Sequence, residues 1–488
     1  MKRKRPQQSR AKAKISDLAF AAVVLAIHIA ITLTVALYHE PWRDEADPWL
    51  IMRDGGVKVM LERTGYMGTP SLWYLIIAPL PKLGLPYFSM TLVHLVIGWA
   101  GVFVFLRYAP FPRWLRFLFA FTYYAAYEYS IVARPYALLM LLLFAVMHSW
   151  PRRHENPIVT AIFVALLANV TTHGLFMALL FGVIFLYETI KLRRLADPRA
   201  LGAMAIMMAA GLITTWELWP PADAPKGHIW RAVDPESAAW AFGNAFLPGA
   251  GLWLPFALAV VALAVIAYAI GRRWAVQFFL WGSLISLTLI YALVWVSGYR
   301  HSGLMLLTVI AALWMATAYD IDPVWLKRAT AVLALSFLYC IVLAVRYWNL
   351  EITRPFSGAR EMAAFIAANH LDHYEIAAHP PPQLEPILPY LPGKHFYYPG
   401  LLMDASYMPW DSYYNSAIRM PYGVAAGEAR NRFGRTWLLL VNTQMKNPEQ
   451  YGFRLIYTNL AVPFEKDDER YWLYAPLDWG GAPLPELR

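Results

Sequence analysis

Long apolar runs alternate with short polar connections over the first 348 residues of the chain. A helix needs about 20 apolar residues to cross the hydrocarbon core of a bilayer. Eleven runs reach or approach this length: residues 18–38, 88–108, 117–129, 134–150, 158–170, 174–190, 201–219, 252–270, 274–296, 303–319 and 329–348. The pattern predicts a polytopic α-helical membrane protein with about eleven transmembrane helices.

The basic residues predict the side of the membrane on which each connection lies. Lys and Arg cluster in every second connection, from the N-terminal MKRKR through RYAPFPRWLR, PRRHEN, KLRRLADPR, GRRW and LKR. Cytoplasmic loops carry such an excess, so we expect a cytoplasmic N-terminus. A further apolar stretch, residues 66–85, is broken by three prolines and a glycine. Because counting it as a span would reverse the pattern, we place it along the outer interface, within an outer loop of residues 39–87.

Two of the predicted spans, 117–129 and 158–170, are short for a membrane crossing and end at the polar segments YEYSIVARPY and VTTHG. Irregular backbone below the membrane surface is tolerated where it lines a wet cavity or is buried in protein. We therefore expect Arg134 and His173, which lie in these segments, to face a cavity. Tilted helices would explain the short spans equally well.

The pattern changes after residue 348. GAREMAAFIAANHL predicts an amphipathic helix, and EIAAHP, RTWLLLVN, FRLIYTN and RYWLYAP predict short strands separated by turns. We therefore divide the chain into a membrane domain, residues 1–348, and a soluble extracytoplasmic α/β domain, residues 349–488.

Composition supports the membrane class and removes one alternative. Hydrophobic residues make up 59% of the chain and charged residues only 15%, whereas soluble domains carry about 25% charged residues. The net charge of +10 is spread over short runs between apolar segments, so we expect membrane lipids, and no nucleic acid, as partners. Short basic cytoplasmic loops and a cysteine-poor outer domain favour a bacterial inner membrane.

The acidic stretch WRDEADPW, residues 42–49, is the first candidate for chemistry. Asp47 precedes a proline, which suggests a helix N-cap. Asp44 and Glu45 belong either to a solvated acidic loop or to a catalytic site with a general base. Because hard divalent ions prefer carboxylate oxygens, a metal shared by Asp44, Glu45 and His39 is a further candidate. The sequence leaves the cofactor unknown.

Four cationic or histidine side chains lie at three outer helix ends: Arg134, His173, Arg300 and His301. Taken singly, each is explained by contact with lipid headgroups or by helix capping. Together they predict a phosphate-binding site that faces the acidic loop. A carboxylate opposite a bound phosphate suits sugar transfer from a polyprenyl phosphate, because the phosphate is already a good leaving group. One carboxylate then suffices to remove the proton of an acceptor hydroxyl.

At these residues the chain resembles the GT-C membrane glycosyltransferases, especially the branch of the protein O-mannosyltransferases and the lipid A aminoarabinose transferases. The similar segments are WRDEADPWLIMR, GYMGTPSLWYLI, YSIVARPYALLML, TTHGLF and GYRHSGLMLL. The resemblance implies a GT-C fold, a polyprenyl-phosphate sugar donor, inverting transfer on the outer face and catalysis by Asp44 and Glu45, with Asp44 as the base. It leaves open whether the acceptor is a lipid, a glycan or a protein, and whether a divalent metal takes part. Relatives often have His-Pro-Pro-Leu where this chain has GTPSL.

Two other function classes remain open from the sequence. A secondary transporter or a lipid or glycan flippase also has many spans, but it predicts ionisable residues near the bilayer midplane and a repeated half. A binding or assembly protein would use the outer domain, where the tyrosines at 397, 398, 413 and 414 either form a sugar-binding surface or pack in the core.

Overall fold

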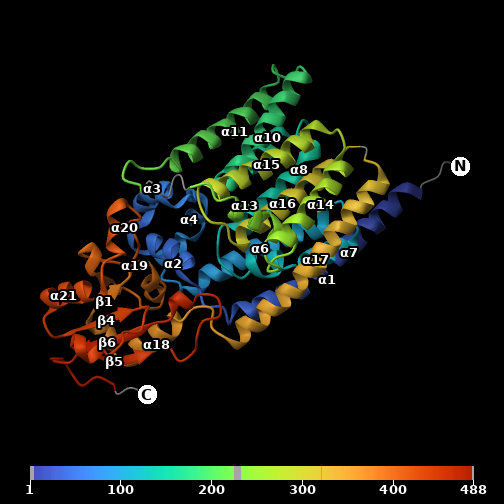
Figure 1. Ribbon diagram of the computed structural model, residues 1–488. Coiled ribbons are helices and arrows are strands. Elements are labelled where there is room, and N and C mark those ends of the chain that lie inside the picture. The colour runs from blue at the N-terminus through green and yellow to red at the C-terminus, as the bar shows by residue number, and fades with distance from the viewer. Residues whose placement is uncertain (1–4, 225–231, 320, 486–488) are drawn as a thin grey trace.

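The computed structural model describes residues 5–224, 232–319 and 321–485. The first four residues of the basic tail, for which we expect a cytoplasmic location, lie outside the described residues. The N-terminal end of the first helix and the C-terminal sheet lie at opposite ends of the molecule (Figure 1).

Seven helices are long and apolar enough to cross a membrane, counted over the described residues. They are Ser16–Ala36 within α1 (Arg5–Ala36), α6 (Phe88–Tyr108), α10 (Thr172–Lys191), α11 (Pro198–Glu217), α14 (Trp253–Ile270), α15 (Trp274–Leu293) and α17 (Pro323–Thr353). Three more predicted spans coincide with the shorter apolar helices α8 (Tyr136–Ser149) and α9 (Pro157–Ala168) and with α16 (Tyr299–Ala316). The predicted polytopic membrane fold is confirmed.

The predicted span 117–129 is wrong as a single helix. Helix α7 (Arg113–Ala120) ends early, and a short π-helix, Tyr124–Glu128, follows after a turn. The tyrosines of this segment find polar partners inside the protein: the Tyr124 hydroxyl donates to the Asn244 carbonyl oxygen at 2.5 Å and the Tyr127 hydroxyl to Glu351 at 2.7 Å. These buried hydrogen bonds favour an irregular segment over a regular membrane helix.

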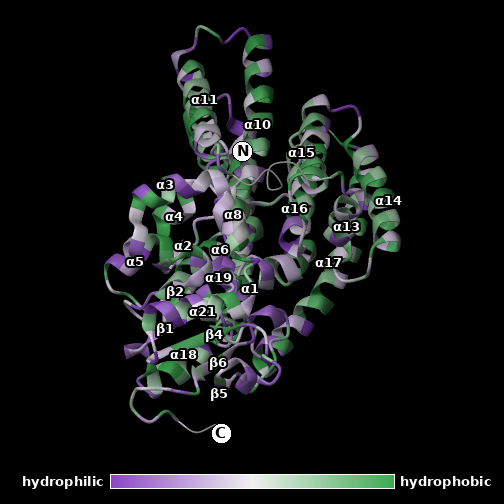
Figure 2. Cartoon of the chain, turned by 60° about the vertical axis from the view of Figure 1, so that its left-hand side comes forward, coloured by the Kyte–Doolittle hydropathy of each residue, from purple (hydrophilic) through white to green (hydrophobic). Residues whose placement is uncertain are grey.

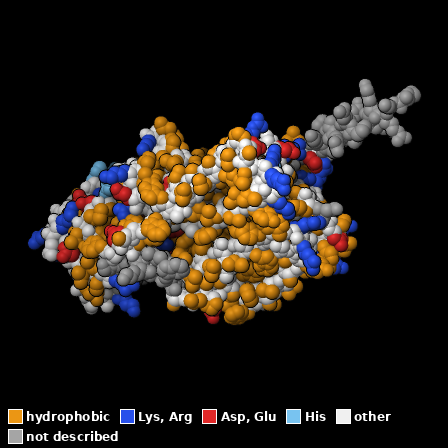
Figure 3. Space-filling model, turned by 90° about the horizontal axis from the view of Figure 1, so that it is seen from above, with side chains coloured by type: hydrophobic (Ala, Val, Ile, Leu, Met, Phe, Trp, Pro, Cys, Tyr) orange, Lys and Arg blue, Asp and Glu red, His pale blue; other side chains and the backbone are white. Residues whose placement is uncertain are grey.

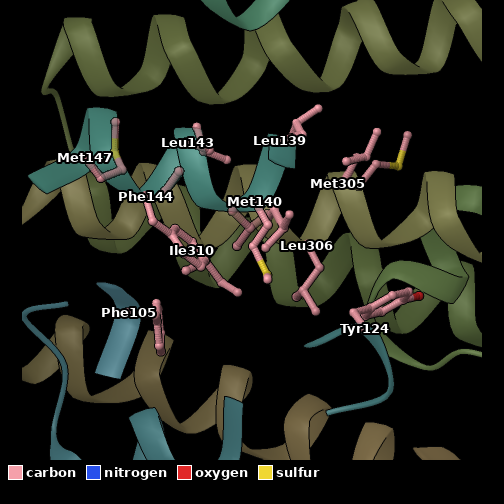
Figure 4. Close-up of a cluster of buried hydrophobic side chains, with 14 of the residues drawn as sticks. Phe105, Tyr124, Leu139, Met140, Leu143, Phe144, Met147, Met305, Leu306 and Ile310 are labelled. Atoms are coloured by element: carbon pink, nitrogen blue, oxygen red, sulfur yellow. The ribbon is translucent and has the colours of Figure 1, made fainter. Parts of the chain in front are cut away.

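Helix α16 lies at the centre of the membrane part. Every residue from His301 to Ala316 is buried. Figure 4 shows Leu306 and Ile310 of this helix among side chains of α6 and α8, including Met140 and Phe105. A helix that is apolar on all sides belongs in the interior of a bundle, which explains its position.

The outer surface of the bundle is apolar. Hydrophobic residues predominate on α10, α14 and α15 in Figure 2, and hydrophobic side chains cover a broad central area of the face seen in Figure 3, with charged side chains toward its two ends. Helix α13 (Pro235–Phe246) packs between α14 and α16. This distribution of hydrophobic residues is the one expected for a protein surrounded by lipid.

The C-terminal part is an α/β unit. Within the described residues it holds a six-stranded sheet in the order β3 (Met403–Ala405), β2 (Phe396–Tyr398), β1 (Glu375–His379), β4 (Trp437–Val441), β6 (Trp472–Pro476) and β5 (Phe453–Thr458). Strand β1 runs parallel to β2 and β4, and the other pairs are antiparallel. The four strands predicted from sequence are present, whereas β2 and β3 are too short for an alternating pattern to reveal them.

The side chains of β4 alternate between two hydrophobic clusters. Leu438 and Leu440 pack with the amphipathic helix α18 (Ala359–Ala368), whereas Leu439 and Val441 pack with α21 (Tyr422–Phe433). The sheet therefore lies between helices, with α19 (Pro381–Leu384) and α20 (Ser412–Ala417) in the connections. The domain division at residue 349 stays a prediction; α17 continues to Thr353.

The loop of residues 39–87 forms short helices instead of a span. These are α2 (Arg43–Leu50), a π-helical turn Ile51–Gly55, α3 (Gly56–Met67), α4 (Ser71–Ile77) and α5 (Pro79–Lys82). Trp49, Leu50 and Met52 are buried in the same hydrophobic cluster as α18 and the sheet. The loop is thus packed against the C-terminal part and is held in a fixed position.

Candidate functional site

Helix α2 carries the acidic stretch, and it begins earlier than the sequence predicts. The helix starts at Arg43, so the prediction that Asp47 is its N-cap is wrong. The Trp42 backbone N–H donates a hydrogen bond to the Glu45 carboxylate at 3.2 Å, and this bond stabilises the first turn of the helix. Pro48 lies inside the helix and has no N–H to donate to the Asp44 carbonyl oxygen. Arg134 Nη1 donates to that oxygen instead, at 3.1 Å.

The Asp44 carboxylate is surrounded by arginines. Its Oδ2 lies 2.5 Å from Arg134 Nη1 and 3.4 Å from Arg300 Nη2, and its Oδ1 lies 3.4 Å from Arg43 Nε. Burial alone would raise the pKa of Asp44, but the guanidinium groups of Arg134, Arg300 and Arg43 outweigh it and hold this pKa well below its usual range. Asp44 is therefore an anion in this arrangement.

Glu45 belongs to a separate, buried column. Its Oε2 lies 3.1 Å from His39 Nε2, and His39 Nδ1 lies 2.8 Å from Oε1 of Glu351 on α17. All three side chains are fully buried. Burial alone would lower the pKa of His39, but the carboxylates of Glu351 and Glu45 raise it to about 10. His39 is therefore protonated and donates a hydrogen bond to each glutamate.

This column bears on two predictions from the sequence, the shared metal and the catalytic role of Glu45, and both stay predictions. A protonated His39 with a hydrogen bond on each ring nitrogen offers no lone pair to a metal, and no metal-binding group of three or more His, Cys, Asp or Glu side chains occurs among the described residues. Glu45 also accepts the Ala133 backbone N–H with Oε1 at 2.5 Å. The Glu45 carboxylate thus contacts His39 and the Ala133–Arg134 segment, and it is not among the residues that line the two cavities described next.

Two neighbouring cavities share part of their lining, including Arg134, which pairs with Asp44. The smaller one, about 220 Å³, is termed the α2 cavity and is lined by Asp44, Asp47, Trp73, Tyr74 and Trp410, among others. The larger one, about 490 Å³, is termed the helix-end cavity and is lined by His173, Trp295, Arg300 and His301, among others. Arg134, Tyr66, Met67, Thr69 and Trp410 line both cavities.

Three helix N-termini point to the helix-end cavity. Tyr136 begins α8, Thr172 begins α10 and Arg300 is the second residue of α16, and all three line the cavity. Helix N-termini carry a partial positive charge and free N–H groups, which favour anions. The four side chains predicted at outer helix ends, Arg134, His173, Arg300 and His301, are all brought together here.

The two histidines of this cavity differ in their hydrogen bonds. His301 Nδ1 accepts the Gly298 N–H at 2.9 Å, so its proton is on Nε2, which remains a donor. His173 is 3% exposed, and among the described residues neither of its ring nitrogens has a hydrogen-bond partner. A buried ring without polar partners in a cationic cavity is available to a ligand.

Several residues of the site carry no sequence signal. Trp42 holds the Arg300 guanidinium at 5.6 Å and the Lys466 ammonium at 3.7 Å over its ring. Glu469 accepts the Arg43 backbone N–H at 3.0 Å. Lys466 and Glu469 lie more than 400 residues from α2 in the chain, so only the tertiary fold reveals them. Trp42 and Arg43, in contrast, lie within the acidic stretch itself, and the charge of Arg43 beside Asp44 was a usable signal.

Comparison with known proteins finds a similar fold among solved structures but no match in sequence. No protein-family model matches the chain, and no curated protein sequence matches it. Among solved structures, the crystal structure of ArnT from Cupriavidus metallidurans in the apo state is similar, with a TM-score of 0.53 and 12% sequence identity over 95% of this chain and 100% of ArnT. The chain therefore shares the fold of ArnT. The resemblance predicted from the motifs is confirmed at the level of the fold.

Proposed function

We propose that this protein is a membrane glycosyltransferase that moves a sugar from a polyprenyl phosphate to an acceptor hydroxyl. The observation that carries the proposal is the position of Asp44, which lines the α2 cavity and pairs with Arg134 and Arg300, two arginines that line the helix-end cavity. One cavity suits an anionic donor headgroup, and the other gives an acceptor access to the same point. The fold shared with ArnT supports this assignment.

The helix-end cavity is the proposed donor site. Arg134, Arg300 and the N–H donor of His301 suit phosphate oxygens, and three helix N-termini add to the positive field. His173 contacts Trp295 and His301, with ring centroids 5.6 Å apart in each pair. These rings form an apolar wall with polar edges, as a phosphate attached to a polyprenyl chain requires.

Asp44 is the proposed general base, and the donor makes it available. In the free protein Arg134 and Arg300 bind Asp44. A donor phosphate offers more negative charge to the same arginines, so it draws them away and lets the pKa of Asp44 rise toward its usual range. The acceptor oxygen then attacks the anomeric carbon, its proton passes to Asp44, and the bond from that carbon to the phosphate oxygen breaks with its electron pair on the phosphate. Attack opposite the leaving phosphate inverts the anomeric centre.

The membrane assignment belongs to the same proposal. The acidic loop and the C-terminal part lie outside, the N-terminus lies in the cytoplasm, and a bacterial inner membrane is the expected location. The alternation of basic connections supports this orientation.

The test uses the purified full-length protein with a panel of labelled polyprenyl-phosphate sugars and lipid, glycan and protein acceptor extracts. We expect transfer from at least one donor. Asp44→Asn should lower kcat by about 10²- to 10⁴-fold, because it removes the base and keeps the shape. Asp54→Asn is the matched control: Asp54 lies in the same loop, pairs with Arg53 at 2.9 Å and is not among the residues that line either cavity.

Full activity of Asp44→Asn would remove the base assignment. Absence of transfer from every donor by the intact, folded protein would overturn the glycosyltransferase proposal and favour a transporter or flippase.

A further inference from the structure

A buried pair of carboxyl groups joins α2 to the C-terminal part beside the α2 cavity. Asp47 lines this cavity and is 5% exposed, and Glu385, from the segment Glu385–Tyr390, is fully buried. The two carboxyl groups are close enough for each to change the pKa of the other, yet Asp47 Oδ1 and both Glu385 oxygens lack a hydrogen-bond partner with good geometry among the described residues. Neither accepts a hydrogen bond from a backbone N–H or a basic side chain in the described part of the chain. A buried carboxyl group with so few hydrogen bonds costs folding free energy unless a ligand forms hydrogen bonds with it.

The surroundings shift the pKa values of the two members of the pair to different extents. Burial raises the pKa of Asp47 to about 6, and the nearby Asp44 also raises it, while the Glu385 carboxyl group, the Trp410 indole N–H and Arg134 act in the opposite direction. Burial and Asp47 raise the pKa of Glu385 well above its usual range, with Arg43 opposing and Asp44 reinforcing the change. Tyr74 and Tyr414 are the other titratable neighbours. Of the two carboxyl groups, Glu385 therefore holds its proton more tightly than Asp47.

The polar groups left free in the two cavities have opposite character. In the α2 cavity both arginines, Arg43 and Arg134, already contact Asp44, so Asp47 is the carboxylate that remains for a ligand. The cavity wall also carries aromatic side chains: Tyr66, Trp73, Tyr74 and Trp410. The indole N–H groups of Trp73 and Trp410 lack a hydrogen-bonding acceptor with good geometry among the described residues. Aromatic faces, N–H donors and one carboxylate suit a ring that presents C–H faces and hydroxyl groups.

We propose that the α2 cavity binds a sugar residue of the acceptor, with Asp47 accepting its hydroxyl hydrogens and Glu385 acting as the positioning residue that orients Asp47. This inference rests on the proposed glycosyl transfer and names its acceptor class. Asp47 lies three residues after Asp44 on α2, so the two side chains share a helix face. A sugar held by Asp47 therefore presents a neighbouring hydroxyl to Asp44. An anionic acceptor is disfavoured because its charge would meet an ionised carboxylate.

The backbone at Trp410 supports a built site. Trp410 lines both cavities and has a φ of 57°, a left-handed conformation that is strained for a residue with a β-carbon. Arg63 Nη1 donates to the carbonyl oxygen of the preceding Pro409, which helps to hold the segment. Strain of this kind persists where the surrounding structure enforces it, and it is frequent at ligand sites.

The experiment measures transfer from whichever labelled donor is active to methyl glycosides of glucose, galactose, mannose and N-acetylglucosamine, each with and without a 6-phosphate. We expect the wild type to prefer a neutral glycoside. Asp47→Asn should raise the KM of that acceptor about 10- to 100-fold without changing the KM of the donor. Glu385→Gln should raise the KM of the acceptor less than Asp47→Asn does, because glutamine can still donate a hydrogen bond to Asp47. Asp54→Asn serves as the control for loss of a carboxylate in the same loop.

A pH profile of the wild type provides a second measurement that needs no variant. Acceptor kcat/KM should fall as the pH drops below about 6, where Asp47 becomes protonated, and donor KM should not follow this change. Preference for the 6-phosphates, or an acceptor KM that Asp47→Asn leaves unchanged, would overturn the inference. So would transfer to a lipid or protein acceptor with every glycoside rejected. Absence of transfer from all donors would instead overturn the proposed function.

Discussion

The helix-end cavity and the α2 cavity share Arg134 and Trp410, yet they offer opposite chemistry. The first presents arginine, histidine and three helix N-termini, whereas the second presents aromatic rings and an ionised Asp47. Asp44 and Arg134 pair at the boundary between them. The difference shows how one short helix contributes to two environments: α2 directs Asp44 and Asp47 to one cavity, and the same Asp44 pairs with Arg134 and Arg300 of the other. Under the proposed function, these environments receive the acceptor and the donor.

Replacement of Arg134, which lines both cavities, should have the largest effect on substrate binding. Arg134→Ala should raise the KM of the donor by about 100-fold and also weaken acceptor use, because Arg134 lines both cavities and fixes both the carboxylate and the carbonyl oxygen of Asp44. Steady-state kinetics with each substrate varied in turn will measure both effects. A change confined to one substrate would show that the two cavities do not depend on Arg134 jointly.

Replacement of Arg300 should separate the effects of the two cavities, because Arg300 lines the helix-end cavity and does not line the α2 cavity. We expect Arg300→Ala to raise the KM of the donor about 10-fold and to leave the KM of the acceptor near the wild-type value. Arg300→Lys should recover part of the loss, since it restores the charge without the guanidinium fork. Arg272→Ala is the control, because Arg272 is an exposed residue in the turn between α14 and α15. An unchanged donor KM in Arg300→Ala would place the phosphate elsewhere.

The buried column under α2 should affect stability, with a defined pH dependence. Because the pKa of His39 is raised to about 10 in the folded protein from about 6.5 when unfolded, its contribution is complete below about pH 6.5 and is lost as the pH rises toward 10. The difference in thermal unfolding temperature between the wild type and His39→Gln should therefore shrink from pH 6 to pH 9.5. A difference that grows with pH would mean that His39 is neutral in the fold.

The sequence predicts the elements that depend on local pattern. The apolar runs locate the long helices, the short apolar segments between turns locate β1, β4, β5 and β6, and the polar helix ends locate Arg134, His173, Arg300 and His301 around one cavity. Each of these features depends on residues close together in the chain, where periodicity and polarity carry information.

The remaining features depend on contacts between distant segments. The sequence cannot show that Glu351 lies on the far side of His39, because the two residues are 312 positions apart, and this contact completes the buried column that holds Glu45. Asp47 was expected to cap a helix, but Glu385 of the C-terminal part makes it half of a buried pair. The interruption at 121–129 arises in the same way, since the tyrosine hydroxyls bond to residues far along the chain.

The central claim is that Asp44 and the donor phosphate bind the same arginines. The most direct measurement is the affinity of an unlabelled polyprenyl phosphate for the wild type and for Asp44→Asn, with thermal unfolding to show that both are folded. Since the substitution removes the competing carboxylate, the account predicts that Asp44→Asn binds the polyprenyl phosphate about 5-fold more tightly, or by about 1 kcal/mol, while it fails to transfer sugar. Equal or weaker binding by Asp44→Asn would contradict the exchange of partners and would separate the arginines of Asp44 from the donor site.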